Sequence, residues 1–222
     1  MDIRKFGTEN PSALILKKAG ELFLENGYKK TSIRQIAKEL NISPGLIGYY
    51  FPSKRDIAVE LFSRQLSWFL DLEKEYVSED DPVLRSAVLI KLQITILSSP
   101  TFCKFYQDAL RDDIILSVIC DSGYDTYLDV SKKYGLSYPE SYYSACNLIA
   151  ASVERTLVLY SDQVGSERNV ADMVFSISMA RIYGSEEFLK AKCEESELIT
   201  VRILCDHPEL VQGWHTQSEP KA

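Results

Sequence analysis

Apolar residues recur along almost the whole chain at spacings of three and four, which is the period of an amphipathic α-helix. Strand-type alternation is scarce, and the 222 residues include only ten glycines and eight prolines. Turn residues such as Gly27, Asp80-Asp81-Pro82 and Gly184-Ser185 mark the breaks between helices. The pattern predicts an all-α protein with helices over 12–26, 32–39, 43–49, 54–77, 82–98, 101–119, 122–134, 139–162, 168–183 and 186–205.

Two of the predicted helices, within residues 31–55, are very short and are joined by a tight turn. Thr31 or Ser32 can cap the first, Asn41-Ile42 makes the turn, and Ser43-Pro44 is typical of a second helix start. The buried face of the first helix is predicted to contain Ile33, Ile36, Ala37 and Leu40. This is the pattern of a helix-turn-helix, whose second helix would enter a DNA major groove.

Three segments follow from this reading. Residues 1–55 are predicted to form a three-helix DNA-binding head, 56–206 a larger helical domain, and 207–222 a polar tail that frays. The helix from Lys54 to about Val77 has no linker before it. We therefore expect it to join head and body rigidly, so that movement in the body could reach the recognition helix.

Over the 42 residues from Ala13 to Lys54, the sequence resembles the TetR family of transcriptional regulators. The resemblance is carried by Ala19, Leu22 and Phe23, by the turn Glu25-Asn26-Gly27-Tyr28, and by Thr31, Ile36-Ala37, Ile42-Ser43-Pro44-Gly45 and Tyr50-Phe51-Pro52-Ser53-Lys54. One position departs from the family pattern: Gly48 stands where a tyrosine is common, which removes one usual phosphate contact. The resemblance implies a homodimer that binds a palindromic DNA operator, with effector binding and dimerisation in the helical domain over 56–206.

The resemblance also implies which residues meet DNA. Tyr50 and Lys54 match phosphate-contacting positions, and Tyr49 and Leu46 are candidates for base contacts, which alone carry sequence information. The helix starts at Thr31, Ser32 and Ser43 place hydroxyls and free N–H groups near phosphates, and Gly45 allows close approach. The full predicted set is Thr31, Ser32, Arg34, Gln35, Ser43, Gly45, Leu46, Tyr49, Tyr50 and Lys54. The alternative for Tyr50 is a packing role against Phe51, and the alternative for Lys54 is a solvated helix start.

The formal charge of −7 is unevenly distributed along the chain. Residues 1–55 contain ten Lys or Arg and five Asp or Glu, a charge of +5, and the remaining 167 residues carry −12. A basic head on an acidic body favours contact with phosphates at one end of the molecule. The alternative is that this difference in charge arose by chance among solvent-exposed residues.

Two later helices, 143–160 and 168–183, are apolar or small nearly all round. A helix of this kind packs inward on one side and against another partner on the other, and in the TetR family the corresponding helices form a four-helix dimer interface. Plain core helices of a monomer are the alternative. Glu154 and Arg155 interrupt the first helix. One could face a cavity and the other the partner, or both could form a surface or interface salt bridge.

Aromatic residues are dense between positions 60 and 135, and they could form either ordinary core or the walls of a ligand cavity. The resemblance implies an effector-binding body, with a small-molecule effector of unknown identity. The candidate ligand-binding residues are Trp68, Phe105, Tyr106, Tyr127, Asn147 and Glu154.

Enzymatic chemistry has little support in the sequence. Five cysteines lack any CxxC pair, and both histidines, His207 and His215, lie near the C-terminus, so we expect no metal site and no bound cofactor. No signal peptide or apolar run long enough for a membrane span is visible, which predicts a cytoplasmic protein with reduced thiols. The sequence favours a repressor released by its effector; an activator, or a regulator without an effector, is the alternative.

Overall fold

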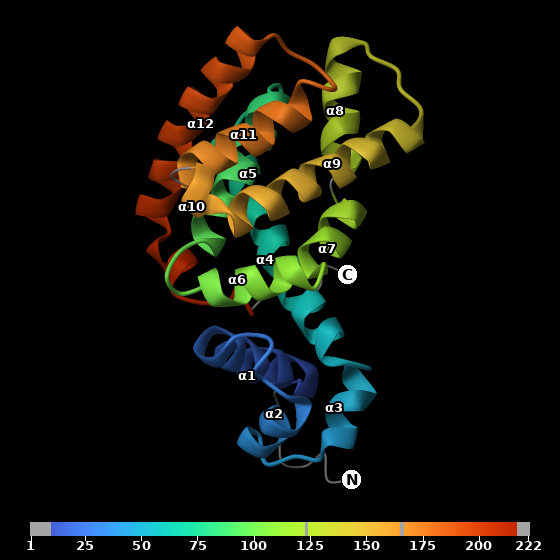
Figure 1. The fold of residues 1–222 in the computed structure, drawn as a ribbon, viewed down its shortest axis with the longest axis vertical. Helices are drawn as coiled ribbons and strands as arrows, with labels where there is room; N and C mark the ends of the chain where they lie inside the picture. The colour runs from blue at the N-terminus through green and yellow to red at the C-terminus, as the bar shows by residue number, and fades with distance from the viewer. Residues whose placement is uncertain (1–9, 123, 165–166, 217–222) are drawn as a thin grey trace.

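The structure is a computed structural model that describes residues 10–122, 124–164 and 167–216. A small helical head lies at one end of an elongated molecule, a larger helical body lies at the other, and α4 runs from one into the other (Figure 1). The predicted all-α class is confirmed. The helices are α1 (Pro11–Asn26), α2 (Ile33–Glu39), α3 (Pro44–Tyr50), α4 (Lys54–Tyr76), α5 (Pro82–Leu97), α6 (Cys103–Arg111), α7 (Ile114–Ser122), α8 (Tyr124–Tyr134), α9 (Glu140–Leu159), α10 (Ser161–Val164), α11 (Glu167–Met179) and α12 (Glu186–Asp206), followed by the 3-10 helix η2 (Pro208–Val211).

Side-chain caps start the three helices of the head. Asn10, Ser32 and Ser43 each accept a hydrogen bond from a backbone N–H in the first turn of α1, α2 and α3. Asn41 has a φ of +54°, a left-handed conformation that asparagine tolerates, and it lies in the turn that follows the first helix of the helix-turn-helix. Ile36 and Ile47 are fully buried between the helices, which fixes α3 against the rest of the head.

Helix α4 begins with a capping box, because Ser53 and Asp56 satisfy each other's backbone N–H groups. Its buried side chains include Ile57 and Leu61 near the head and Phe69 and Leu72 in the body. The hydrophobic core is therefore continuous from head to body.

The body is organised around α5, which packs against α4, α8, α11 and α12. Lys91 of α5 is buried, and its ammonium donates to the carbonyl of Cys193 at 2.9 Å and pairs with Asp172 at 2.7 Å and Glu197 at 3.3 Å. A buried charge needs such partners. Lys91 thus ties α5 to α11 and α12.

The prediction of a single helix over 101–119 is wrong. The chain turns between α6 and α7, where Asp113 has a φ of +54°. The guanidinium of Arg55 donates to the carbonyls of Asp112 at 2.6 Å and Asp113 at 3.0 Å. Carbonyls left free at a helix end need partners. A residue 57 positions earlier supplies them here, which local periodicity does not reveal.

The predicted fraying of the tail from residue 208 is also wrong for the described part of that tail. Trp214 packs edge-on against Phe102 and Phe105, and its Nε1 donates to the carbonyl of Gly20 in α1 at 3.2 Å. The ring of His215 stacks on Trp68 with 4.4 Å between centroids. Residues 207–216, which we term the C-terminal strap, therefore bring α12 back to the head.

Replacing Gly20 by alanine is expected to displace Trp214 from the head. A Cβ atom at position 20 would lie 2.6 Å from Cδ1 of the Trp214 indole, and real Cβ atoms do not make such contacts. In a Trp68→Phe background, the emission of Trp214 should shift to the red as its ring becomes hydrated. Gly48→Ala, with no atom within 4 Å, is the control; unchanged emission in the Gly20 variant would contradict the strap contact.

Two further expectations concern cysteines and membranes. Cys103, Cys146, Cys193 and Cys205 are free thiols, and the side chain of Cys120 lies outside the described residues. In the part of the chain that the structure describes, no helix is long and apolar enough to span a bilayer.

Candidate functional site

The outer face of α3 exposes an aromatic side chain at the end of the head. Tyr49 is 74% exposed, although tyrosine usually buries its ring, and it contacts Tyr50 edge-on with 5.1 Å between ring centroids. Gly45 and Gly48 are exposed on the same short helix, and a Cβ at position 48 would meet no atom within 4 Å. The surface of α3 is thus a narrow ridge with one large aromatic ring.

Polar groups surround this ridge at the starts of α2 and α3. Ser32 Oγ accepts from the backbone N–H of Gln35, and Ser43 Oγ accepts from that of Leu46, each at 3.2 Å. Both serines are exposed, as is Arg34. The two serines therefore cap their helices while remaining on the surface.

Two predicted DNA-contacting residues lie inside the head instead. Thr31 is 2% exposed, and its hydroxyl donates to the carbonyls of Leu22 at 3.1 Å and Gly27 at 2.9 Å. Leu46 is 7% exposed. The expectation that these side chains meet DNA is therefore corrected: the hydroxyl of Thr31 holds the turn after α1, and Leu46 anchors α3 by its apolar side chain.

Lys54 is half-buried and its ammonium points into the head. It donates to the carbonyls of Tyr28 at 2.7 Å and Thr31 at 2.8 Å and lies 4.2 Å from the centre of the Tyr28 ring. Burial lowers its pKa. Lys54 therefore links the start of α4 to the turn before α2. Two of its three ammonium hydrogens are used in these bonds, and the third could still donate to a DNA phosphate.

The body contains a cavity between α4, α5 and α9, which we term the inner cavity. Its volume is about 70 Å³. Of the six predicted ligand residues, Tyr127, Asn147 and Glu154 line it. The remaining walls are mainly apolar and include Leu66, Leu89, Ile90, Ala150, Ala151 and Val174.

Glu154 is buried and is held by two donors. Gln93 Nε2 donates to its Oε1 at 2.8 Å and its Oε2 at 2.9 Å, and the Tyr106 hydroxyl donates to Oε1 at 2.5 Å. Burial raises the pKa of Glu154 to about 7, and the two donors act in the opposite direction. Burial and the adjacent carboxyl raise the pKa of Tyr106, so it keeps its proton.

The other three predicted ligand residues do not line the inner cavity. Trp68 stacks on His215, and Phe105 packs against Phe23 and Trp214 in the core. Tyr106 lies behind Glu154 and acts on the cavity through it. Gln93 was not among the predicted ligand residues, although the sequence carried a signal for it: a polar side chain within a largely apolar stretch of α5.

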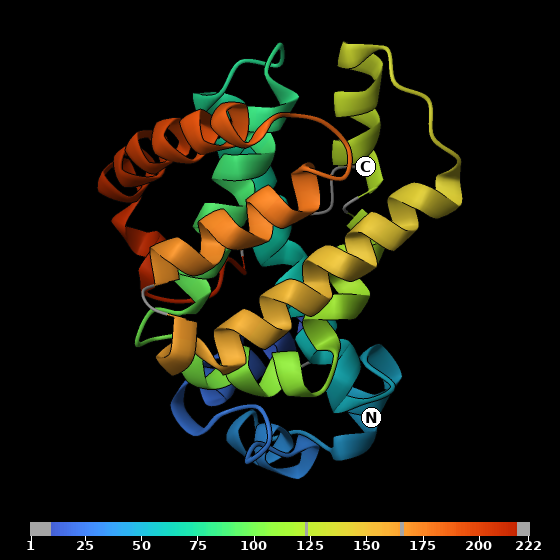
Figure 2. The same cartoon turned by 45° about the horizontal axis from the view of Figure 1, so that its top comes forward.

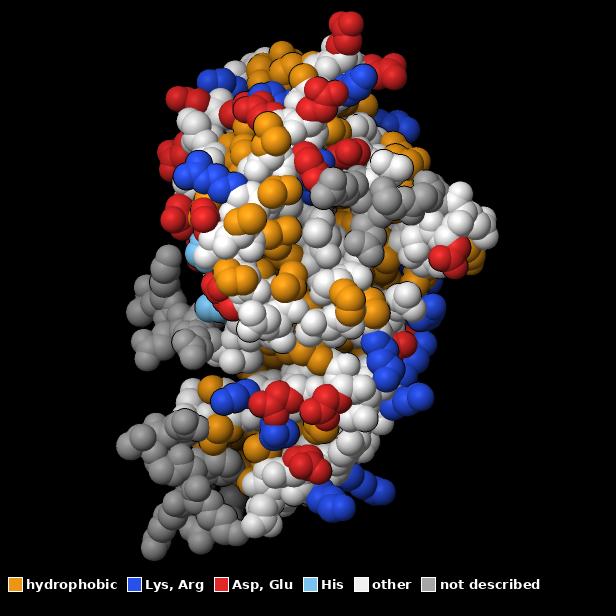
Figure 3. Space-filling view, turned by 90° about the vertical axis from the view of Figure 1, so that its left-hand side faces the viewer, with side chains coloured by type: hydrophobic (Ala, Val, Ile, Leu, Met, Phe, Trp, Pro, Cys, Tyr) orange, Lys and Arg blue, Asp and Glu red, His pale blue; other side chains and the backbone are white. Residues whose placement is uncertain are grey.

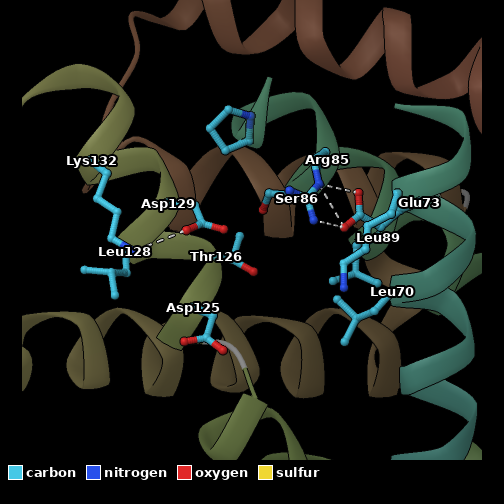
Figure 4. Close-up of a pocket in the computed structure, with 12 residues that line it drawn as sticks. Leu70, Glu73, Arg85, Ser86, Leu89, Asp125, Thr126, Leu128, Asp129 and Lys132 are labelled. Carbon is cyan, nitrogen blue, oxygen red and sulfur yellow. Dashed lines mark hydrogen bonds and ion pairs between the residues drawn. The ribbon is translucent and has the colours of Figure 1, made fainter. Parts of the chain in front are cut away.

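A second cavity of about 390 Å³, the outer cavity, adjoins the first through shared walls at Leu70, Ser86, Leu89 and Thr126. Its sides are charged, with α4 and α5 facing α8 across the opening (Figure 4). Arg85 makes a two-pronged ion pair with Glu73, at 2.7 Å for the shortest contact. Asp125, Asp129 and Lys132 project from α8.

Helices α9 and α11 lie side by side across one face of the body (Figure 2). Leu148 is 48% exposed, and Met173 and Ile177 are each 39% exposed. Ala151, by contrast, is buried at the inner cavity. Exposed apolar side chains also occur on α12, at Leu198 and Val201, and Figure 3 shows an apolar band on that side of the body, flanked by charged groups.

Comparison with known proteins agrees with this architecture. Residues 15–61 match the family model for bacterial regulatory proteins of the tetR family. The fatty acid metabolism regulator protein of Bacillus subtilis (strain 168) is 34% identical over 65 residues, which are 29% of this chain and 34% of that protein. The uncharacterized HTH-type transcriptional regulator YuxN of the same organism is 42% identical over 50 residues, 22% of this chain and 17% of that protein.

The matched segments thus span about a third and a sixth of these relatives' lengths. Among solved structures, RolR without ligand superposes with a TM-score of 0.59 at 12% identity, covering 86% of this chain and 96% of RolR. That likeness extends the shared fold beyond the head into the body. Residues 15–61 thus match the tetR family of bacterial regulatory proteins, and the fold of the chain is similar to that of RolR.

Proposed function

We propose that this protein is a homodimeric transcriptional repressor, which binds a palindromic operator through α3 and releases it when a small molecule occupies the body cavities. The observation that carries the DNA-binding part is the exposed ridge of α3 within the matched segment 15–61. Ser32, Arg34, Gln35, Ser43, Gly45, Tyr49 and Tyr50 form its proposed contact set. A basic head, of charge +5 over residues 1–55, supports phosphate contact at this end.

The proposed partner subunit covers the face made by α9 and α11. Leu148, Met173 and Ile177 expose apolar surface there, alongside small residues such as Ala145 and Ser152 that permit close helix packing. A two-fold axis through this face would present two heads to one DNA duplex. Half-sites one turn apart require recognition helices about 34 Å apart.

Helix α6 supplies a path from the cavity to the head. On one side Tyr106 donates to Glu154 at the cavity. On the other, Asp108 accepts from the backbone N–H of Lys29 at 3.0 Å, and Lys104 donates to the carbonyl of Glu25 at 3.3 Å. A ligand that moves Glu154 would therefore shift α6 and, with it, the head, selecting a head spacing that fits DNA poorly.

Removing the Tyr49 ring tests the DNA-binding proposal. We expect Tyr49→Ala to weaken binding to a DNA fragment from the protein's own promoter by about tenfold, because the lost ring meets the groove. The melting temperature should not fall, since Tyr49 is mostly exposed. The measurement is a fluorescence anisotropy titration at several salt concentrations.

Tyr160→Ala is the matched control, because Tyr160 is 59% exposed but lies at the end of α9 in the body. It should bind the fragment as the unmodified protein does. Equal affinity of the Tyr49 variant would remove this residue from the interface. Failure of the unmodified protein to bind promoter DNA more tightly than unrelated DNA would refute the function itself.

A further inference from the structure

One face of α9 forms a wall of the inner cavity with a polar group at each end. Asn147 and Glu154 are seven residues apart, about 10 Å along a helix axis. Ala150 and Ala151 lie between them and also line the cavity. Their methyl groups occupy little space, so the wall has a hollow between the two polar ends.

Both polar ends have unused hydrogen-bonding capacity. Glu154 Oε1 accepts hydrogen bonds from Gln93 and Tyr106. Among the described residues, only Gln93 donates to Oε2, which can therefore accept another hydrogen bond. Asn147 is 3% exposed, and its Nδ2 has no hydrogen-bond partner within the described structure. A buried amide N–H without an acceptor is costly. A bound molecule could supply a donor at one end and an acceptor at the other.

The charge of the inner cavity limits what can enter it. Its described walls contain Glu154 and no lysine, arginine or histidine. A carboxylate or phosphate at this depth would lie beside a buried acid without a compensating cation, which is strongly unfavourable. The outer cavity has two lysines and an arginine, but Arg85 is already paired with Glu73, and two further acids, Asp125 and Asp129, line the opening.

The volumes set the size of the molecule. The inner cavity, about 70 Å³, holds only the end of a ligand, and the outer cavity, about 390 Å³, has room for the rest. Leu70 and Leu89 belong to both cavities, so the connection between them is at least partly apolar.

We infer that the cavity binds a small, mainly apolar, neutral or cationic molecule that donates a hydrogen bond to Glu154 and accepts one from Asn147. That this molecule is the effector rests on the proposed function; its chemistry rests on the cavity alone. An amine or hydroxyl group fits the Glu154 end, and a hydroxyl or carbonyl oxygen fits the Asn147 end. Molecules whose inserted end is anionic are excluded.

Three para-substituted phenols test the inference on one scaffold. They are 4-(aminomethyl)phenol, 4-(hydroxymethyl)phenol and 4-hydroxybenzoate, titrated into the full-length protein by isothermal calorimetry without DNA. The amine and the alcohol should bind at up to millimolar concentration, and the benzoate should bind at least tenfold more weakly. At pH 8, where the Glu154 carboxyl is mostly ionised, the amine should lose about tenfold in affinity in Glu154→Gln, since a charged acceptor becomes neutral, and the alcohol should lose less.

Asn147→Leu gives a second, independent readout, because it removes the free N–H while keeping the side chain's size. All binding phenols should lose affinity in this variant, and circular dichroism melts establish that both variants fold. Glu194→Gln, at an exposed carboxylate of α12 that lines neither cavity, is the matched control and should bind as the unmodified protein does.

Binding of 4-hydroxybenzoate as tight as that of the amine, unchanged amine affinity in Glu154→Gln, or no binding of either donor probe would each overturn the inference. Because no DNA is present, these outcomes are separate from the proposed regulatory function. Loss of promoter binding in the earlier experiment would leave the ligand chemistry standing, and the reverse also holds.

Discussion

Replacing Ile177 by glutamate is expected to convert the protein to monomers and to abolish operator binding. Ile177 is 39% exposed on α11, which packs against α9, the helix that carries the exposed Leu148 of the proposed dimer face. In a dimer each variant subunit would bury an unpaired carboxylate against an apolar partner, which costs several kcal/mol on each side of the two-fold axis. A monomer presents one head and loses the second half-site. Sedimentation velocity and promoter binding measure the two effects.

Leu198→Glu is the matched control, since it adds the same charge to an apolar residue that is 74% exposed on α12. It should remain dimeric and bind DNA. Ala151 of α9, the other helix of the proposed dimer face, is unsuitable for this test because it is buried at the inner cavity. An Ile177→Glu protein that sediments as a dimer would place the interface elsewhere.

Replacing Glu154 by glutamine is expected to change how stability depends on pH. Burial raises the pKa of Glu154 from 4.5 to about 7 in the folded protein. A raised carboxyl pKa means that the folded state holds the proton more tightly than the unfolded state. The stabilisation that the protonated Glu154 gives to the folded state is therefore complete below pH 4.5 and is lost as the pH rises through 7. The shift corresponds to about 3 kcal/mol.

The expected result is that the free energy of unfolding of Glu154→Gln, relative to the unmodified protein, rises by about 3 kcal/mol between about pH 5 and about pH 8. Tyr106 and Tyr127 face the same site, but burial raises the pKa of each, so both stay protonated over this range. Urea unfolding at a series of pH values measures the difference.

Glu73→Gln serves as the comparison, because Glu73 is also buried but is paired with Arg85. Removing its charge leaves Arg85 half-buried without a partner, so this variant should be destabilised at both ends of the range. Parallel stability curves for Glu154→Gln and the unmodified protein would show that the carboxyl titrates alike in the folded and unfolded states.

Local signals predicted the head well because its elements depend on neighbours in sequence. Ser32, Ser43 and Ser53 cap the helices that follow them, and Asn41 makes the turn between α2 and α3. The break after α6 was missed because its partner, Arg55, is remote in sequence. The order of the C-terminal strap was missed for the same reason, since Trp214 packs against α1 and α6.

The candidate site likewise contains some features that the sequence predicted and others that depend on tertiary packing. Periodicity placed Tyr49 and Tyr50 on the second helix of the helix-turn-helix, but it could not tell that Leu46 faces inward from that helix. For the cavity, composition indicated an aromatic body, whereas only packing decides which aromatics reach a void. Phe105 packs against Phe23 and Trp214 in the core. Asn147 and Glu154 line the cavity, although their helix was predicted to form the dimer interface because of its apolar surface.

The helical class, the helix-turn-helix and the basic head could be predicted from the residues alone, because caps and short-range periodicity depend on near neighbours and charge can be counted along the chain. The tertiary structure alone decided which polar groups are shared between distant helices. Lys54 turns inward because the carbonyls of Tyr28 and Thr31 meet it there, and Glu154 becomes a buried acid because Gln93 and Tyr106 converge on it. Such partners lie tens of residues apart, and only the packed fold brings them within hydrogen-bonding distance.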